Sequence, residues 1–184
     1  MIELKKVSLS FEGKAIFKDF NLTLNDGGIV LITGNSGCGK TTLARLILGL
    51  LKTDSGSINT NGARIATVFQ EDRLVPTLTA KQNISLVSND IEAEKRLADM
   101  ELSGSEELFP EDLSGGMKRR VSIARALAFG GDVLLLDEAF SGIDKELALR
   151  IIDKIYKEYK DKLIIAITHR TELFDGYECT EIKI

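Results

Sequence analysis

Residues 29–42 read IVLITGNSGCGKTT, and this stretch decides the fold. Its first five residues are apolar or β-branched, a composition typical of a short buried strand. Residues 34–41, GNSGCGKT, then match the pattern G-x-x-x-x-G-K-[ST]. A strand, a glycine-rich loop and a helix in this order predict a loop whose backbone N–H groups surround phosphate oxygens. We therefore expect Lys40 to reach the β- and γ-phosphates of a nucleotide and Thr41 to bind Mg²⁺.

The rest of the chain alternates between short apolar runs and amphipathic segments. We expect strands over residues 2–11, 20–24, 29–33, 65–69, 133–136 and 163–168. We expect helices over residues 43–50, 91–100 and 145–159 and from residue 115 onward. A capping box formed by Thr79 and Gln82 predicts one more helix start, whereas residues 54–62, DSGSINTNG, are rich in turn residues.

This alternation predicts an α/β fold, because strands separated by helices form parallel sheets. We expect a P-loop NTPase core with a mostly parallel sheet, flanked by an N-terminal antiparallel β subdomain. A short helical subdomain, at about residues 71–115, would be inserted into this core. The length of 184 residues suits one domain spanning residues 1–184.

Composition narrows the class of protein. Hydrophobic residues make up 43% of the chain, charged residues 28%, and the net charge is −4, which argues against a dedicated nucleic-acid binder. The chain has two cysteines, Cys38 and Cys179, which lie far apart in the sequence and lack metal-ligand spacing, so no disulfide framework is expected and a reducing cytosol fits. The first residues alternate like a strand, so no signal peptide is expected. Apolar runs such as LIIAI are far below the ~20 residues that span a bilayer, so other chains would have to supply any membrane path.

A strand ending in two carboxylates, VLLLDE at residues 133–138, follows further along the chain. In α/β folds, ligand-binding groups gather at the carboxyl ends of strands. Asp137 would then hold Mg²⁺ through water, and Glu138 would act as general base toward the water that attacks the γ-phosphate. The pair could instead cap the next helix and face solvent, and the two motifs together also fit a small-molecule kinase.

A second anion-binding helix start appears in LSGGMKRR, residues 113–120. Ser114, Gly115 and Gly116 precede a basic helix, where exposed N–H groups and the helix dipole favour an anion. The alternative is an ordinary N-cap with a glycine hinge. A single phosphate loop does not explain why one small domain carries two such helix starts.

Taken together, the motifs resemble those of the nucleotide-binding subunits of ATP-binding cassette (ABC) transporters. The resemblance covers nearly the whole chain and rests on the order of its motifs. These are Phe11 at the end of a strand, GNSGCGKTT at 34–42, Gln70 in VFQEDR, LSGGM at 113–117, VLLLDE at 133–138, SGID at 141–144 and His169 in ITHR. LSGGM with basic residues after it, and VFQEDRLVP upstream, resemble the nitrate, sulfonate and taurine importer branch.

The resemblance implies an ATPase in which two subunits pair head to tail. Each ATP would lie between the phosphate loop of one subunit and Ser114, Gly115 and Gly116 of the other, with Asp144 at the same interface. The implied catalytic residues are Lys40, Gln70, Glu138 and His169. The implied ATP contacts are Phe11, Gly34, Asn35, Ser36, Gly37, Cys38, Gly39, Lys40, Thr41, Thr42, Ser114, Gly115 and Gly116. The implied Mg²⁺ ligands are Thr41, Gln70 and Asp137.

Some of these positions also have plain structural explanations. Phe11 would stack on adenine, yet it could be an ordinary core aromatic. Gln70 could be a surface residue, and a lone histidine such as His169 is often structural. Met117 stands where many relatives have glutamine, which leaves the contacts of that position open.

The same resemblance implies partners and a location. We expect a homodimer or a pair with a similar ATPase subunit, bound to integral membrane permease subunits and served by an extracytoplasmic solute-binding protein. Nucleic acid is not expected as a partner. The chain would be cytoplasmic and held on the inner face of the membrane by the permease, with no regulatory domain after His169. The alternative is a soluble ABC-type ATPase that is not coupled to a transporter.

Overall fold

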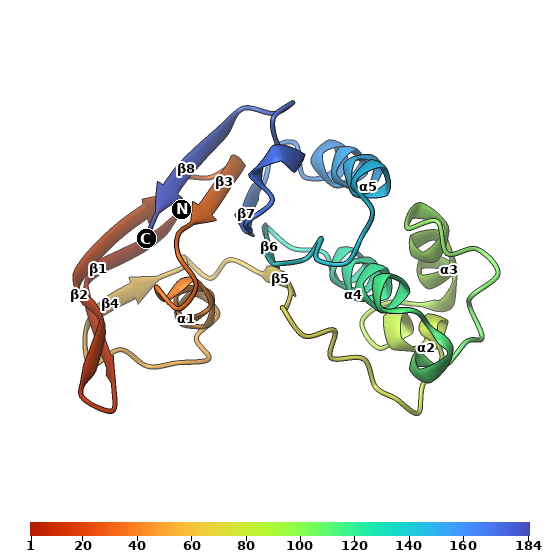
Figure 1. Cartoon of the computed structure of the whole chain (residues 1–184), viewed down its shortest axis with the longest axis horizontal. Coiled ribbons are helices and arrows are strands. Elements are labelled where there is room, and N and C mark those ends of the chain that lie inside the picture. Colours follow the sequence, from red (N-terminus) through yellow and green to blue (C-terminus); the bar gives the residue numbers. More distant parts are fainter.

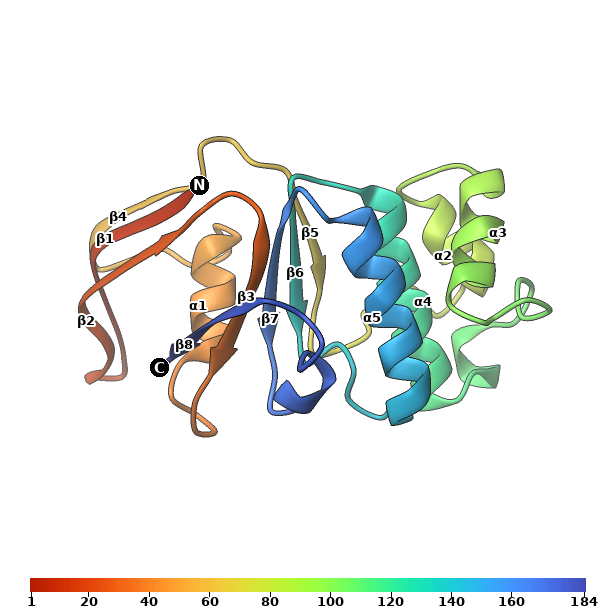
Figure 2. The same cartoon turned by 90° about the horizontal axis from the view of Figure 1, so that it is seen from above.

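Residues 1–184, all of which the computed structural model describes, form two β-sheets and five α-helices arranged in layers (Figures 1 and 2). The larger sheet has five strands in the order β5-β6-β7-β3-β8, and every neighbouring pair is parallel. Its strands are β3 (Gly28–Thr33), β5 (Ile65–Val68), β6 (Val133–Asp137), β7 (Leu163–Ile167) and β8 (Cys179–Lys183). The predicted α/β class with a parallel core is therefore confirmed.

A three-stranded antiparallel sheet, β2-β1-β4, lies beside the parallel sheet. Its strands are β1 (Ile2–Phe11), β2 (Lys14–Leu24) and β4 (Ser55–Asn59). Helix α1 (Lys40–Ile47) lies between the two sheets, as Figure 2 shows. One hydrophobic core fills this layer and joins buried side chains of β1, α1 and one face of β3, β6 and β7.

The other face of the parallel sheet is covered by α4 (Gly115–Phe129) and α5 (Lys145–Glu158) (Figure 2). A second hydrophobic core occupies this layer. Side chains of the central strands alternate between the two cores: Ile29 and Leu31 point to the α4–α5 side, and Val30 and Ile32 to the α1 side. The central strands are therefore buried on both faces, as expected for parallel strands.

Between β5 and α4 the chain forms α2 (Ala80–Ser85), α3 (Asp90–Asp99) and the short 3₁₀ turn η1 (Pro110–Asp112), which lie outside α4. The predicted capping box at the start of α2 is confirmed, because the Thr79 hydroxyl accepts from the Gln82 backbone and the Gln82 side chain accepts from the Thr79 backbone. Arg96 of α3 donates to Glu158 of α5 at 2.8 Å and ties this segment to the core. None of the helices combines the length and the apolar composition that a membrane span requires.

Several predicted boundaries were wrong. The turn-rich residues 54–62 contain strand β4, which pairs with β1, and β2 begins at Lys14 rather than at Phe20. Helix α1 runs over Lys40–Ile47 instead of residues 43–50, because the phosphate loop leads directly into its first turn. A further strand near the C-terminus, β8, pairs with β3 and was not predicted.

Candidate functional site

The glycine-rich loop joins the end of β3 to the start of α1. A side chain at Gly34 would collide with the carbonyl oxygen of Ile184 and the Sγ atom of Cys38. Gly39, the residue before α1, has φ 111°, and a side chain there would meet Ile16 at 2.9 Å. Because no side chain caps α1, its first N–H groups stay available to a ligand. Glycine at these two positions therefore allows the chain to close tightly around an anion.

Lys40 begins α1 and is only 8% exposed. Its Nζ atom donates to the carbonyl oxygens of Gly34 at 2.8 Å and Asn35 at 3.0 Å. A buried ammonium group is costly unless it is paired, and these two carbonyls provide the pairing. The backbone of the phosphate loop thus holds the positive charge of Lys40 in place.

Asp137 is the last residue of β6 and is 3% exposed. Burial raises the pKa of this carboxyl group, and the neighbouring Thr41 hydroxyl opposes the effect. Its Oδ1 atom is buried and has no hydrogen-bond partner. Because Mg²⁺ prefers hard oxygen ligands, an unpaired carboxylate oxygen beside a threonine hydroxyl fits this ion.

Glu138 follows directly and adopts the left-handed backbone conformation, with φ 49°. Its backbone N–H donates to the Ile167 carbonyl at 2.9 Å, which fixes this conformation to the end of β7. Its Oε1 atom lies 3.6 Å from the Nε2 atom of His169, which follows the same strand. The Glu138 side chain is 19% exposed and that of His169 56%, so both can meet a ligand entering from solvent.

Gln70 lies just beyond β5, with its side chain exposed. The guanidinium group of Arg119, on α4, holds the backbone of this loop by donating to the carbonyls of Phe69, at 2.7 Å, and Gln70. Arg119 also lies 3.2 Å from the carboxylate of Asp72. The backbone of this loop is therefore anchored, and Gln70 contributes to the wall of the cleft.

These groups surround one cleft of about 250 Å³. Ten of the predicted residues line it: Ser36, Gly37, Gly39, Lys40, Thr41, Thr42, Gln70, Asp137, Glu138 and His169. Gly34, Asn35 and Cys38 belong to the same loop but do not form the wall. The remaining lining residues, Ile16 and Ile167, were not predicted. Ile16 lies in β2, ahead of the residues 20–24 that were predicted to form this strand. No sequence pattern therefore indicated that Ile16 lines the cleft.

Four predicted residues lie away from this cleft. Phe11, at the end of β1, is 45% exposed. Ser114, Gly115 and Gly116 start α4, where the Ser114 hydroxyl accepts from the Met117 N–H at 3.3 Å. The structure of one chain thus separates the two predicted anion-binding helix starts.

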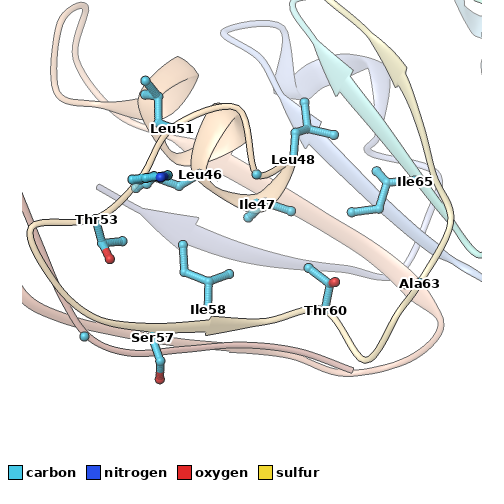
Figure 3. A pocket seen from close by; sticks show the side chains of 13 residues that line it. Leu46, Ile47, Leu48, Leu51, Thr53, Ser57, Ile58, Thr60, Ala63 and Ile65 are labelled. Atoms are coloured by element: carbon cyan, nitrogen blue, oxygen red, sulfur yellow. The ribbon is translucent and has the colours of Figure 1, made fainter.

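A larger groove, of about 840 Å³, lies between the end of α1 and β4 (Figure 3). Its walls are mainly aliphatic, with Leu46, Ile47, Leu51 and Ile58 among the side chains drawn in Figure 3. Lys52 is the only charged residue that lines it. This groove has no carboxylate, no histidine and no phosphate loop, so the smaller cleft is the candidate catalytic site.

Comparison with known proteins agrees with the fold. The family model described as ABC transporter matches residues 17–141, and the chain belongs to this family of ATP-binding cassette ATPases. The predicted family, fold class and ATPase function are therefore confirmed. The roles of individual site residues stay predictions.

Among curated relatives, an aliphatic sulfonates import ATP-binding protein of Pseudomonas savastanoi is 39% identical over 87% of this chain and 70% of its own length. The taurine import ATP-binding protein of Escherichia coli O157:H7 is 35% identical over 94% of this chain and 74% of its own. The spermidine/putrescine import ATP-binding protein of Haemophilus influenzae is 36% identical over 94% of this chain, which spans 52% of that protein.

Two solved structures of the cassette MJ0796, both dimeric, are similar to the whole chain at 26% identity. Their TM-scores are 0.87 and 0.86, and 96% and 94% of their chains are covered. The first of them is described as a post-hydrolysis state bound to ADP and Pi.

Proposed function

We propose that this chain hydrolyses ATP as one half of a dimer, and that the dimer drives import of a small solute through partner membrane subunits. One observation carries the proposal: the phosphate loop, Gln70, Asp137, Glu138 and His169 gather in one cleft from four separate strand ends. The import ATP-binding relatives support the direction of transport.

Within the cleft, Lys40 and the N–H groups of the loop would hold the phosphates of ATP. Lys40 would exchange its carbonyl partners for phosphate oxygens, which are stronger acceptors because they are charged. Thr41, Gln70 and Asp137 would hold Mg²⁺, which supplies charge neutralisation for the β- and γ-phosphates. Phe11 would contribute a stacking surface for adenine, a contact that is sequence-tolerant because it uses the π-face.

Glu138 would accept the proton of the attacking water as the oxygen bonds to the γ-phosphorus and ADP leaves. Its Oε1 atom lies 3.6 Å from the Nε2 atom of His169, which supports a role for both groups beside the γ-phosphate. His169 would donate to a γ-phosphate oxygen, and stabilisation of that charge is the larger part of catalysis in such sites.

The site of one chain would be completed by a second chain. Ser114, Gly115 and Gly116 lie outside the cleft of their own chain, at the start of a 15-residue helix whose N-terminus attracts anions. In a head-to-tail dimer this segment would contact the γ-phosphate held by the partner. Both solved MJ0796 structures are dimeric, which supports this arrangement.

A second groove, of about 310 Å³, would receive the membrane subunit. It lies between the end of α1, β5 and α4, beside the loop that carries Gln70. Leu50, 56% exposed, and Val87, 37% exposed, contribute to its rim, and Arg73 and Arg125 add positive charge. Such a surface fits a short segment with apolar residues and a carboxylate. Residues 71–115 would then move as a subdomain when ATP closes the dimer.

In this proposal the chain works at the cytoplasmic face of the membrane, bound through the permease. An extracytoplasmic solute-binding protein would deliver the solute to that permease. The nature of the solute would be decided by these partner chains rather than by the residues of the cleft.

The first test compares the native chain with Glu138→Gln in a steady-state ATPase assay and measures solution mass with and without Mg-ATP. We expect the variant to lose at least about 100-fold in rate, because general-base catalysis contributes about 10²–10⁴. We also expect it to become dimeric only with ATP. Equal rates for both proteins would refute the catalytic assignment.

A second test asks whether the chain is coupled to a membrane protein. In extracts of its own cells the native chain should sediment with membranes, and Leu50→Glu should release it while the ATPase rate of the purified chain persists. The matched control is Leu149→Glu, which charges an exposed leucine on α5 outside the groove. A native chain found only in the soluble fraction would favour the alternative of an uncoupled ATPase.

A further inference from the structure

Arg170, the residue after His169, links two loops of the cleft edge. Its Nη1 atom donates to the carbonyl oxygens of Phe140, at 2.8 Å, and Ile143, at 2.9 Å. Its backbone N–H donates to the Thr168 hydroxyl at 2.9 Å, and its Nε atom lies 3.4 Å from Glu172. The guanidinium is half-buried, so these charge-assisted hydrogen bonds are partly shielded from water.

The loop that Arg170 holds, residues 138–144, joins β6 to α5. Inside the loop only two backbone hydrogen bonds form, Ser141 to Glu138 at 3.1 Å and Ile143 to Phe140 at 3.3 Å. Ser141 and Gly142, at its tip, are exposed, and Gly142 has φ 74°. The side chains of Phe140 and Ile143 are buried in the core, which anchors the two sides of the loop. Arg170 adds hydrogen bonds to the backbone carbonyls of these same two residues, directly beside the exposed tip.

The tip of this loop rests against the second anion-binding segment. A Cβ atom on Gly116 would come within 3.1 Å of the Gly142 carbonyl oxygen, so the two backbones lie close together and leave little room for a side chain. A continuous set of contacts therefore runs from the residue beside His169 through loop 138–144 to Gly116 and Ser114. One end of this set lies at the chain's own cleft, and the other faces outward.

We propose that Arg170 is a positioning residue that couples the two ATP sites of the dimer by holding loop 138–144 against Gly116. The proposal rests on the proposed function, since it assumes that Ser114 and Gly116 serve the partner's ATP. Movement of His169 when the chain's own γ-phosphate binds or leaves is passed through Arg170 to this segment. Arg170 itself contacts neither nucleotide.

Three variants test the proposal: Arg170→Ala, Arg170→Lys and, as a matched control, Arg64→Ala. Arg64 also donates to a backbone carbonyl, that of Phe129 at 2.7 Å, but lies at the opposite end of the sheet from the cleft. Lysine keeps a positive charge that can reach the carbonyl oxygens but lacks the planar guanidinium group. Arg170→Lys should therefore keep part of the dimer affinity that Arg170→Ala loses. Thermal melting of each variant checks that it is folded.

Two quantities are then compared in the Glu138→Gln background. The first is the affinity of the dilute single chain for a fluorescent ATP analogue, and the second is the dissociation constant of the ATP-driven dimer from analytical ultracentrifugation. For Arg170→Ala we expect the first to stay within about twofold and the second to weaken about 10- to 100-fold, from the loss of two charge-assisted hydrogen bonds. Arg170→Lys should fall between, and Arg64→Ala should match the parent.

Two results would overturn the proposal. A dimer as tight with Arg170→Ala as with the parent would mean that the loop needs no support from Arg170. A parallel loss of ATP affinity in the single chain would mean that Arg170 supports only its own cleft. If the parent fails to dimerise with ATP, the proposed function itself fails, and the two failures are thus distinguished.

Discussion

The left-handed backbone at Glu138 predicts that, of two variants that shorten this side chain, the glycine variant is more stable than the alanine variant. Glu138→Ala and Glu138→Gly both remove the carboxylate, but only glycine adopts φ 49° without strain. Holding a residue with a Cβ atom in this region costs about 1–2 kcal/mol. Glycine also has more conformational freedom in the unfolded chain, which lowers the free energy of unfolding of Glu138→Gly by about 0.4–1 kcal/mol. We therefore expect Glu138→Gly to be the more stable variant by about 0.8 kcal/mol.

For a chain of this size the difference corresponds to about 2 °C in melting temperature. Differential scanning calorimetry and urea unfolding, without nucleotide, measure it. The control is the pair Lys95→Ala and Lys95→Gly on the exposed face of α3, where alanine should be the more stable by about 1 kcal/mol. Both Glu138 variants should lose ATPase activity equally.

The reasoning fails if Glu138→Ala is at least as stable as Glu138→Gly while the Lys95 pair keeps its usual order. The backbone at residue 138 would then carry no strain. If the expected order is found, the chain holds its proposed general base in a costly conformation that aims the carboxylate into the cleft, as strained residues at functional sites often do.

Three further predictions concern single side chains. Tyr159 is 1% exposed with an unpartnered hydroxyl, so Tyr159→Phe should add about 1 kcal/mol to the free energy of unfolding at neutral pH. Burial raises the pKa of Tyr159 to about 12, above the value of about 10 in an unfolded chain. The native protein should therefore lose stability as the pH rises from about 10 to about 12, and Tyr159→Phe should lose less. Urea unfolding at pH 8 and pH 11 measures this difference. Ser114→Asp should keep the helix cap and the melting temperature but abolish the ATP-driven dimer seen by light scattering, since its carboxylate would face the partner's γ-phosphate. Alkylation of the half-buried Cys38 with iodoacetamide should block ATP binding, and Mg-ATP should slow the reaction; normal binding by the alkylated chain would show that this loop is not the phosphate site.

Those parts of the fold that depend on local composition could be predicted from the sequence. The apolar runs VLLL, in β6, and LIIAI, in β7, are buried on both faces, so their identity as strands follows from their side chains alone. Strand β4, with the sequence SGSIN, is mostly exposed and contains a glycine. It is a strand only because its backbone pairs with β1, from Glu3 opposite Asn59 onward, and no local pattern records that pairing.

The same distinction applies to the cleft. Residues of the phosphate loop and the carboxylates after β6 lie in short motifs, and the sequence places them together. The contacts of Arg119 and Arg170 span 27 to 50 residues and end on backbone carbonyls, so only the folded topology reveals them. Met117, whose contacts the sequence left open, packs against the core on the α4–α5 side.

The side chains of β3 alternate between two cores, with Ile29 and Leu31 in one and Val30 and Ile32 in the other. This alternation affects which substitutions the protein can tolerate during evolution. The phosphate loop continues from a strand that is supported independently from each side. A substitution such as Leu31→Ala opens a cavity in one layer and leaves the packing of the other layer intact. Substitutions can therefore accumulate in one layer at a time, while the loop and the catalytic edge of the sheet keep their positions.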